Sequence, residues 1–352
     1  MQVVYSRVHL LHNTDQVEIE GQPFVTEEVP HRAEVLLAAV QAAGLGPVVA
    51  PTDHGLAPIL AVHEAEYVEF LRTVYARNAA ATGRAEPLVP WTFATRYTGR
   101  RPNSLRGLLG YYAFGGGSPI LEGTWTAAYW SAQCALTAVD LVLGGKRAAY
   151  ALCRPPGHHA GRDLYGGFCY LNNAAIAARY VQAWLNKVSG TEKQVPGTSK
   201  VAILDIDYHH GNGTQAIFYA DPGVLYCSLH AHPDDDYPYY WGQAGERGQG
   251  AGEGFNHNWP LPSGIDDTGY LAALAQALAT IREYRPAALV VSAGLDIGAG
   301  DPSGGFAVTP GGLREIGRRI AALGLPTVLM QEGGYKLDTL GENAVALLQG
   351  AS

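Results

Sequence analysis

The feature that most constrains the fold is a regular alternation of apolar runs with alanine-rich segments along the chain. The apolar runs are continuous, as expected of strands buried on both faces of a parallel sheet. This alternation predicts an α/β protein with a parallel β-sheet flanked by helices on both faces. The expected strands are 47–50, 148–153, 201–206, 224–229, 287–292 and 327–330. The expected helices are 32–43, 64–75, 126–143, 173–186, 268–284 and 311–323.

No internal repeat and no break in composition divides the 352 residues, so we expect a single domain over 1–352. Two segments look like insertions into it. Residues 76–107 are rich in Ala, Arg, Pro and Gly and contain Trp91 and Phe93. Residues 187–200 are polar and separate a helix from a strand, which predicts a surface loop.

Composition narrows the class of protein. Hydrophobic residues make up 47% of the chain and charged residues 16%, which is typical of a globular protein with a large core. The net charge of −8 argues against a nucleic-acid partner. No apolar run is long enough to span a membrane, and the start of the chain is too polar for a signal peptide. The four cysteines form no Cys-x-x-Cys pair, which predicts buried free thiols and a cytoplasmic protein.

The run 203–213 reads Ile-Leu-Asp-Ile-Asp-Tyr-His-His-Gly-Asn-Gly and is the clearest chemical signal. Residues two apart on a strand face the same side, so Asp205, Asp207 and His209 are expected to project together, with His210 opposite. Carboxylates and imidazoles are ligands of divalent metals. A charged strand end closed by a turn is the plainer alternative, but four such residues after a buried strand are costly without a partner.

Reactive residues follow four of the expected strands. The strand 148–153 leads to Arg-Pro-Pro-Gly-His-His-Ala, and 201–206 leads to the run just described. The strand 287–292 leads to Asp296, and 327–330 leads to Gln-Glu-Gly-Gly-Tyr. Ligands of parallel α/β sheets bind at the carboxyl ends of strands, so we expect these residues to meet in one crevice.

Within that crevice, Asp207, His209 and Asp296 would supply three metal ligands and leave one side open. Three ligands with an open position are typical of catalytic zinc. Two carboxylates with one imidazole also leave Fe²⁺, Co²⁺ and Mn²⁺ possible.

The pair His158 and His159 follows Pro-Pro-Gly and is expected to transfer protons, because neighbouring imidazoles can divide the work of base and acid. Tyr335 after Gly-Gly could donate to a developing oxyanion, or it could simply cover the core. Gly167 and Phe168 suit the wall of a narrow channel, although the same stretch could also begin a helix.

Five ordered motifs resemble those of the zinc-dependent histone deacetylase family, over nearly the whole chain. Within the family, the chain is most similar to bacterial acetylpolyamine amidohydrolases, for example in Gly-Tyr-Tyr-Ala-Phe at 110–114 and Tyr-Pro-Tyr-Tyr-Trp-Gly at 237–242. The resemblance implies the arginase/deacetylase fold and an amidohydrolase. The five motifs are Arg-Pro-Pro-Gly-His-His-Ala, Gly-Phe-Cys-Tyr-Leu-Asn-Asn, Asp-Ile-Asp-Tyr-His-His-Gly-Asn-Gly-Thr-Gln, Ser-Ala-Gly-Leu-Asp and Glu-Gly-Gly-Tyr.

The resemblance also implies a role for each of these residues. Zinc would polarise the amide carbonyl and activate a water molecule. Asp205 would support His158, and Asn212 would support His159 and favour a proton-donor role for it. The implied zinc ligands are Asp207, His209 and Asp296, and the implied catalytic residues are His158, His159 and Tyr335.

Further implications concern a second ion, the channel and assembly. A structural K⁺ is implied behind the zinc. Phe168 and Tyr240 would form two channel walls beside Gly167. The insertion 76–107 would restrict the mouth and build a homodimer. The implied K⁺ ligands are backbone oxygens of Asp205, Asp207, His209 and Leu229, with the hydroxyl of Ser228.

For the substrate, the resemblance implies a small cationic acetylated amine such as an acetylpolyamine, with Glu18 near its distal ammonium. The arginines at 96, 100, 101 and 106 and the sequence Ser-Leu-His-Ala-His-Pro at 228–233 depart from the polyamine enzymes. Acetyl-lysine in proteins is therefore the alternative substrate. A non-catalytic metal-containing binding module is a third hypothesis. A binuclear manganese ureohydrolase would need further Asp and His ligands at the strand ends, which we do not find.

Overall fold

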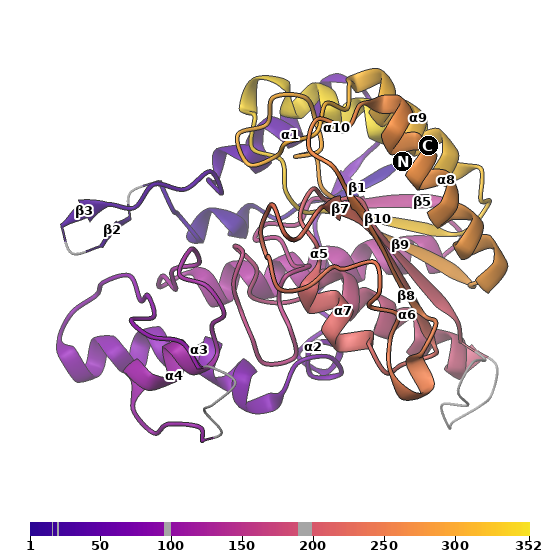
Figure 1. Ribbon diagram of the computed structural model, residues 1–352. Coiled ribbons are helices and arrows are strands. Elements are labelled where there is room, and N and C mark those ends of the chain that lie inside the picture. Colours follow the sequence, from indigo (N-terminus) through magenta and orange to yellow (C-terminus); the bar gives the residue numbers. More distant parts are fainter. Residues whose placement is uncertain (16, 20, 95–99, 189–198) are drawn as a thin grey trace.

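The computed structural model describes residues 1–15, 17–19, 21–94, 100–188 and 199–352. Its centre is an eight-stranded sheet in the order β4-β1-β5-β10-β9-β6-β7-β8, in which every neighbouring pair is parallel (Figure 1). The expected parallel α/β architecture is confirmed. The strands are β1 (Gln2–Val4), β4 (Val48–Val49), β5 (Ala148–Ala151), β6 (Val201–Asp205), β7 (Val224–Ala231), β8 (Asn256–Leu261), β9 (Ala288–Ala293) and β10 (Thr327–Gln331).

Helices cover both faces of the sheet (Figure 1). Successive strand residues enter the two cores alternately. In β6, Val201 and Ile203 pack into one core, and Ala202 and Leu204 pack into the other. The first core contains residues of α2 (Ala57–Leu60), α3 (Ala65–Thr82), α4 (Leu105–Tyr111), α5 (Thr124–Leu143), α6 (Asn173–Val188) and α7 (Asn212–Phe218). The second contains residues of α1 (His31–Ala42), α8 (Asp267–Tyr284), α9 (Pro310–Ala321) and α10 (Leu337–Gly350).

The two expected insertions differ from a plain loop. Helix α3 continues to Thr82, so the start of the 76–107 segment is helical, and α4 begins near its end. Helices α3 and α4 project from the body on the same side as the short hairpin of β2 (Glu18–Ile19) and β3 (Gln22–Pro23) (Figure 1). Of the 187–200 segment, α6 takes residues up to Val188, and 189–198 lie outside the described residues.

The strand order explains where the reactive residues meet. Four strands were expected to lead into reactive residues. They are consecutive neighbours at the centre of the sheet, in the order β5, β10, β9 and β6. Because they are parallel, their carboxyl ends lie at one edge. In the part of the chain that the structure describes, no helix is long and apolar enough to cross a membrane.

Candidate active site

The side chains of Asp207, His209 and Asp296 converge at the ends of β6 and β9, with one donor atom from each lying within 4.8 Å of the others. The Nδ1 atom of His209 lies 3.3 Å from Oδ1 of Asp207 and 3.2 Å from Oδ2 of Asp296. Both carboxylates are buried. Buried carboxylates this close to each other are unfavourable unless a cation or proton compensates them.

Backbone N–H groups hold these carboxylates in place. The N–H of Gly333 donates to Oδ2 of Asp207 at 2.8 Å, and that of Tyr208 donates to Oδ1 of Asp296 at 3.0 Å. The other oxygen of Asp296, Oδ2, is buried without a hydrogen-bond donor among the described residues. A divalent cation would satisfy a carboxylate oxygen that lacks a hydrogen-bond donor and lies beside an imidazole. The ligand atoms of Asp207, His209 and Asp296 therefore fit a metal ion.

Strand alternation had predicted that the side chain of Asp205 projects together with those of Asp207 and His209. In the structure it does not. The strand ends at Asp205, and the chain then turns away from strand geometry. The Oδ2 atom of Asp205 lies 3.1 Å from Nδ1 of His158 and accepts a hydrogen bond from the phenol of Tyr226 at 2.9 Å. Asp205 therefore lies behind His158, where the family resemblance implied it would be.

The rings of His158 and His159 lie side by side, with centroids 4.0 Å apart, and each has its own polar partner. His159 places Nδ1 2.7 Å from Oδ1 of Asn212, the first residue of α7. An amide oxygen can only accept, so His159 carries its proton on Nδ1 and leaves Nε2 free. The Nδ1 atom of His158 lies beside the carboxylate of Asp205 instead of an amide oxygen.

These different surroundings separate the proton affinities of the two rings. Burial disfavours charge on His158, but the carboxylates of Asp207 and Asp205 outweigh it and raise the pKa of His158 to about 10. Burial, together with the neighbouring charges of His158 and His209, lowers the pKa of His159 well below its ordinary value. Of the two rings, His159 is therefore the one that favours the neutral form.

Tyr335 reaches the same site from the end of β10. The carboxylate of Asp301 accepts hydrogen bonds from the N–H groups of Tyr335 and Lys336, at 2.7 and 3.1 Å. The guanidinium of Arg32 lies 4.4 Å from the centre of the Tyr335 ring. Burial raises the pKa of Tyr335 well above its ordinary value, so its phenol remains a hydrogen-bond donor at neutral pH.

Glu332 is a site residue that the sequence analysis did not single out. Its buried Oε2 accepts hydrogen bonds from the N–H groups of Gly157 and His158, and Oε1 accepts one from Ser292. Its carboxylate therefore ties the histidine loop to the loop that carries Tyr335. A buried acid directly before Gly-Gly-Tyr was the available signal.

A cavity of about 250 Å³ leads to these groups and forms a channel. Phe168 and Gly167 line it, as expected. Tyr240 does not: its side chain is 81% exposed, and Tyr237 from the same loop lines the channel instead. The channel is lined by Gly115, Gly116, Gly117, Pro156, His158, His159, Gly167, Phe168, His209, Tyr237, Ser303, Gly333 and Tyr335.

Glu18 also lies outside the channel. It is exposed on β2 and lines a separate surface pocket of about 510 Å³ with Trp91 and Arg106 of the 76–107 segment. Two arginines of that segment contact other side chains. Arg101 pairs with Glu66, and Arg106 stacks on Trp91, whereas position 96 is outside the described residues.

Of the residues expected around K⁺, three lie on the neighbouring strands β6 and β7. Asp205 of β6 and Ser228 of β7 are opposite each other in register, and Leu229 follows Ser228. The Ser228 hydroxyl lies 2.7 Å from Nδ1 of His230, whose Nε2 lies 2.9 Å from the carbonyl of Gly242. Because Nε2 donates to that carbonyl, Nδ1 accepts a hydrogen bond from the Ser228 hydroxyl. The Ser228 oxygen, which also lies 3.4 Å from Nδ1 of His210, keeps acceptor capacity for a cation.

Comparison with known proteins agrees with this geometry. The family model of the histone deacetylase domain matches residues 26–351. Acetylpolyamine amidohydrolase 1 of Pseudomonas aeruginosa is 47% identical, over 99% of this chain and 97% of its own length. The acetylpolyamine amidohydrolase of Mycoplana ramosa is 41% identical over the full length of both chains.

The fold matches as well. The crystal structure of an acetylpolyamine aminohydrolase from Burkholderia pseudomallei superimposes with a TM-score of 0.89 at 41% identity, covering 100% of this chain and 98% of the other. The resemblance expected from the five motifs is confirmed. The chain belongs to the histone deacetylase family.

Proposed function

We propose that this protein is a zinc-dependent deacetylase that hydrolyses the acetyl amide of acetylated polyamines or similar small acetylated amines. The observation that carries the proposal is the convergence of a three-ligand metal group, a histidine pair and a phenol on one channel. Family members are generally metal-dependent, and the relatives similar over their full length are named for acetylpolyamines.

When bound by Asp207, His209 and Asp296, zinc would polarise the acetyl carbonyl and acidify a water molecule. Neutral His159 would take a proton from that water through Nε2 and deliver it to the departing amine. His158 would hold positive charge beside Asp205 and stabilise negative charge in the transition state. The Tyr335 phenol would donate to the oxyanion of the tetrahedral intermediate.

Residues around this core would bind substrate and a second ion. We place Gly167, Phe168 and Tyr237 along the acetylated chain. The expected K⁺ would be held by Ser228 and by backbone oxygens of Asp205, Asp207, His209 and Leu229, where it would fix the loop that carries the zinc ligands. Glu18 keeps a substrate role in this proposal only if a second subunit brings it to the channel.

The decisive experiment compares kcat/KM of the zinc-loaded protein on N-acetylputrescine, N-acetylcadaverine and an acetyl-lysine peptide. We expect the acetylated diamines to be the better substrates. The Asp207→Ala variant should lose both bound zinc, measured by elemental analysis, and activity. A preference for the peptide would favour the protein deacetylase alternative. Absence of hydrolysis of all three compounds, with no effect of Asp207→Ala, would contradict the proposed enzyme.

A homodimer through residues 76–107 is part of the proposal. Exposed Trp91 and Phe93 on the projecting segment support it, because large exposed aromatic groups mark interfaces. Light scattering should give the mass of a dimer for the wild type and that of a monomer for Trp91→Asp; Trp184→Asp, an exposed tryptophan on α6, is the control. A cytoplasmic location is proposed from the four buried free cysteines.

A further inference from the structure

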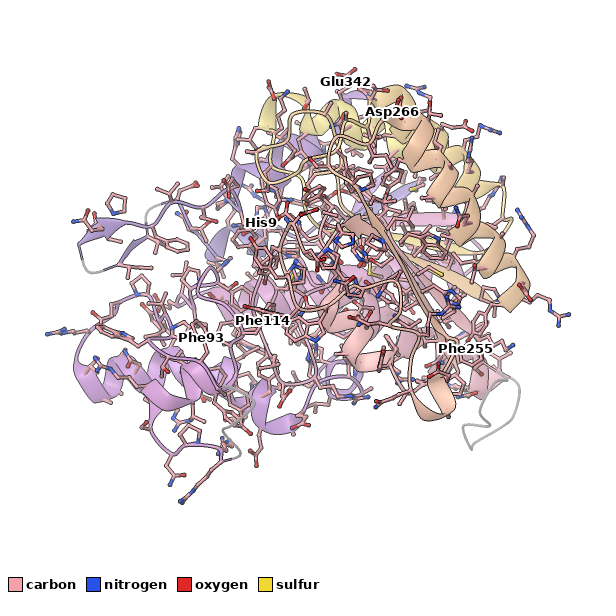
Figure 2. All side chains as sticks on the ribbon, in the orientation of Figure 1. His9, Phe93, Phe114, Phe255, Asp266 and Glu342 are labelled. Atoms are coloured by element: carbon pink, nitrogen blue, oxygen red, sulfur yellow. The ribbon has the colours of Figure 1, made fainter. Side chains whose placement is uncertain are left out.

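One wall of the channel consists of three consecutive glycines, Gly115, Gly116 and Gly117. The segment runs between Phe114, whose ring stacks with Tyr237, and Ser118, whose hydroxyl accepts the N–H of Phe168. Figure 2 shows Phe93 on the side of the projecting helices and Phe114 nearer the body of the protein. The glycine segment therefore borders both the channel and the 76–107 segment.

Neither backbone conformation nor packing requires glycine at these three positions. None of them has a positive φ angle. A Cβ atom would lie 4.0 Å from Oη of Tyr237 at position 115, 3.9 Å from Cζ of Phe93 at 116 and 4.0 Å from Cε1 of Phe168 at 117. These are ordinary van der Waals distances. Alanine would therefore fit, whereas at Gly167 a Cβ atom would lie 2.4 Å from the His159 ring.

The backbone of the segment is also unpaired. Among the residues that the structure describes, no N–H or C=O group of positions 115–117 takes part in a hydrogen bond. Gly116 and Gly117 are exposed. The segment thus lines the channel with unpaired backbone groups, both N–H and C=O, and no side chains.

The channel lining lacks the acidic group that a cationic substrate would otherwise need. Within the described residues, no Asp or Glu side chain lines it, and Glu18 lies in another pocket. Carbonyl oxygens carry partial negative charge and accept hydrogen bonds from ammonium groups, each of which has three donors. Unpaired carbonyl groups of the glycine segment can therefore act as acceptors along the channel.

We propose that Gly115–Gly117 determines specificity by binding the distal ammonium of the substrate through its backbone carbonyls. The amine chain lies in the space that side chains would fill and extends towards Phe93. This inference rests on the proposed function and extends it, because it assigns the channel to acetylated amines that carry a second, charged nitrogen.

The stability of the variants separates this role from a packing role. Replacing glycine by alanine at a compatible backbone position restricts the unfolded chain and stabilises a protein. Gly116→Ala should therefore have an unchanged or higher Tm, and any loss of activity would not reflect damage to the fold. Gly245 is the matched control, since it is exposed, has no positive φ angle and has nothing within 4 Å of its Cβ position.

The test compares N-acetylcadaverine with N-acetylhexylamine, in which a methyl group replaces the ammonium. We measure kcat and KM for the wild type, Gly116→Ala, Gly116→Val and Gly245→Ala. The wild type should prefer the cationic amide. That preference should fall about tenfold in Gly116→Ala, and further in Gly116→Val, through KM rather than kcat, as expected when one or more methyl groups occlude a binding pocket. Gly245→Ala should match the wild type.

An unchanged preference in Gly116→Val would overturn the inference and leave the proposed deacetylase function intact. If the wild type hydrolyses neither amide, the proposed function fails, and calorimetric binding of the same two compounds decides the inference instead. Stronger binding of the cationic compound, weakened in Gly116→Val, would support it. Equal binding of the two compounds by the wild type would refute it.

Discussion

At the scale of single residues, the phenol of Tyr335 is the group whose removal is easiest to interpret. Its ring is held by Arg32, its backbone N–H by Asp301, and neither contact involves the hydroxyl. Tyr335→Phe should therefore keep the fold and the Tm while kcat falls about 10²- to 10³-fold, as for loss of an oxyanion donor. Steady-state kinetics on N-acetylputrescine measure this effect. A kcat equal to that of the wild type would contradict the role of Tyr335 as a hydrogen-bond donor to the oxyanion.

A second residue, Tyr237, has a buried hydroxyl with no hydrogen-bond partner among the described residues. Burying such a group costs roughly 1–3 kcal/mol. Because the ring packs against His159 and Phe114 without using the hydroxyl, Tyr237→Phe should increase the free energy of unfolding by up to about that amount. Urea denaturation measures the change. A less stable variant would mean that the hydroxyl has a partner in solution.

The same residues show how far the site could be predicted from sequence. Metal-type and proton-transfer side chains directly after buried strands were recognisable, because parallel strand ends must meet at one edge. The position of a residue after a strand could not show whether Tyr237 or Tyr240 lines the channel. Both lie in a loop without periodicity, where Tyr239 has a φ angle of 62° and turns the chain between them. The acid before Gly-Gly-Tyr was visible in the sequence, but its partners, two backbone N–H groups and the distant Ser292, were not, so Glu332 was missed.

At the scale of elements, one buried carboxylate joins three segments around the site. Glu28 accepts hydrogen bonds from Arg154 at 2.8 and 3.0 Å and from Arg32 at 3.0 Å. Arg154 leads into the histidine loop, and Arg32 in α1 donates to the carbonyls of Glu332 and Gly334. Burial alone would raise the pKa of Glu28, but the two guanidinium groups hold it below its ordinary value.

Glu28→Gln would leave two buried guanidinium groups without a compensating charge. We expect the free energy of unfolding to fall by about 3–5 kcal/mol, as for a broken buried ion pair. The exposed pair of Arg72 and Glu69 provides the control, because Glu69→Gln should change stability little. Thermal and urea denaturation of both variants give the comparison. Equal effects in the two variants would show that the buried pair contributes no more than a surface pair.

Two strands of the central sheet, β8 and β1, were absent from the expected set, and their sequences are polar or short. Strand β8 reads Asn-His-Asn-Trp-Pro-Leu and lies at the sheet edge, where one side needs no apolar partner strand. Strand β1 is only three residues long. The two-residue edge strand β4 lies within the expected strand 47–50, and the other apolar runs that predicted strands correctly belong to β5, β6, β7, β9 and β10, which lie inside the sheet.

At the scale of the whole molecule, buried neutral histidines couple stability to pH. His63 is buried, and its Nε2 accepts the N–H of Asn172 at 2.9 Å. Burial, partly offset by backbone carbonyls, lowers the pKa of His63 from 6.5 to about 4. The unfolded chain therefore binds this proton more readily than the folded protein does.

The consequence for stability has a definite sign. The contribution of His63 is fully present above pH 6.5 and is lost as pH falls from 6.5 towards 4, by roughly 3 kcal/mol in total. His63→Gln keeps a hydrogen-bond acceptor but cannot be protonated. Its free energy of unfolding, measured by urea denaturation between pH 4 and 7, should fall less steeply with acid than that of the wild type. If the free energy of unfolding fell equally steeply with acid in the wild type and in His63→Gln, the lowered pKa of His63 would be contradicted.

The position of β10 has a consequence for biosynthesis. This strand, made from residues 327–331, lies between β5 and β9, which are translated earlier. A nascent chain that has emerged only as far as β9 lacks the strand that joins the two halves of the sheet, and also lacks Tyr335. Catalytic competence should therefore arise in one step after residue 335 leaves the ribosome, and chains released before that point should be substrates for proteolysis rather than partly active enzymes.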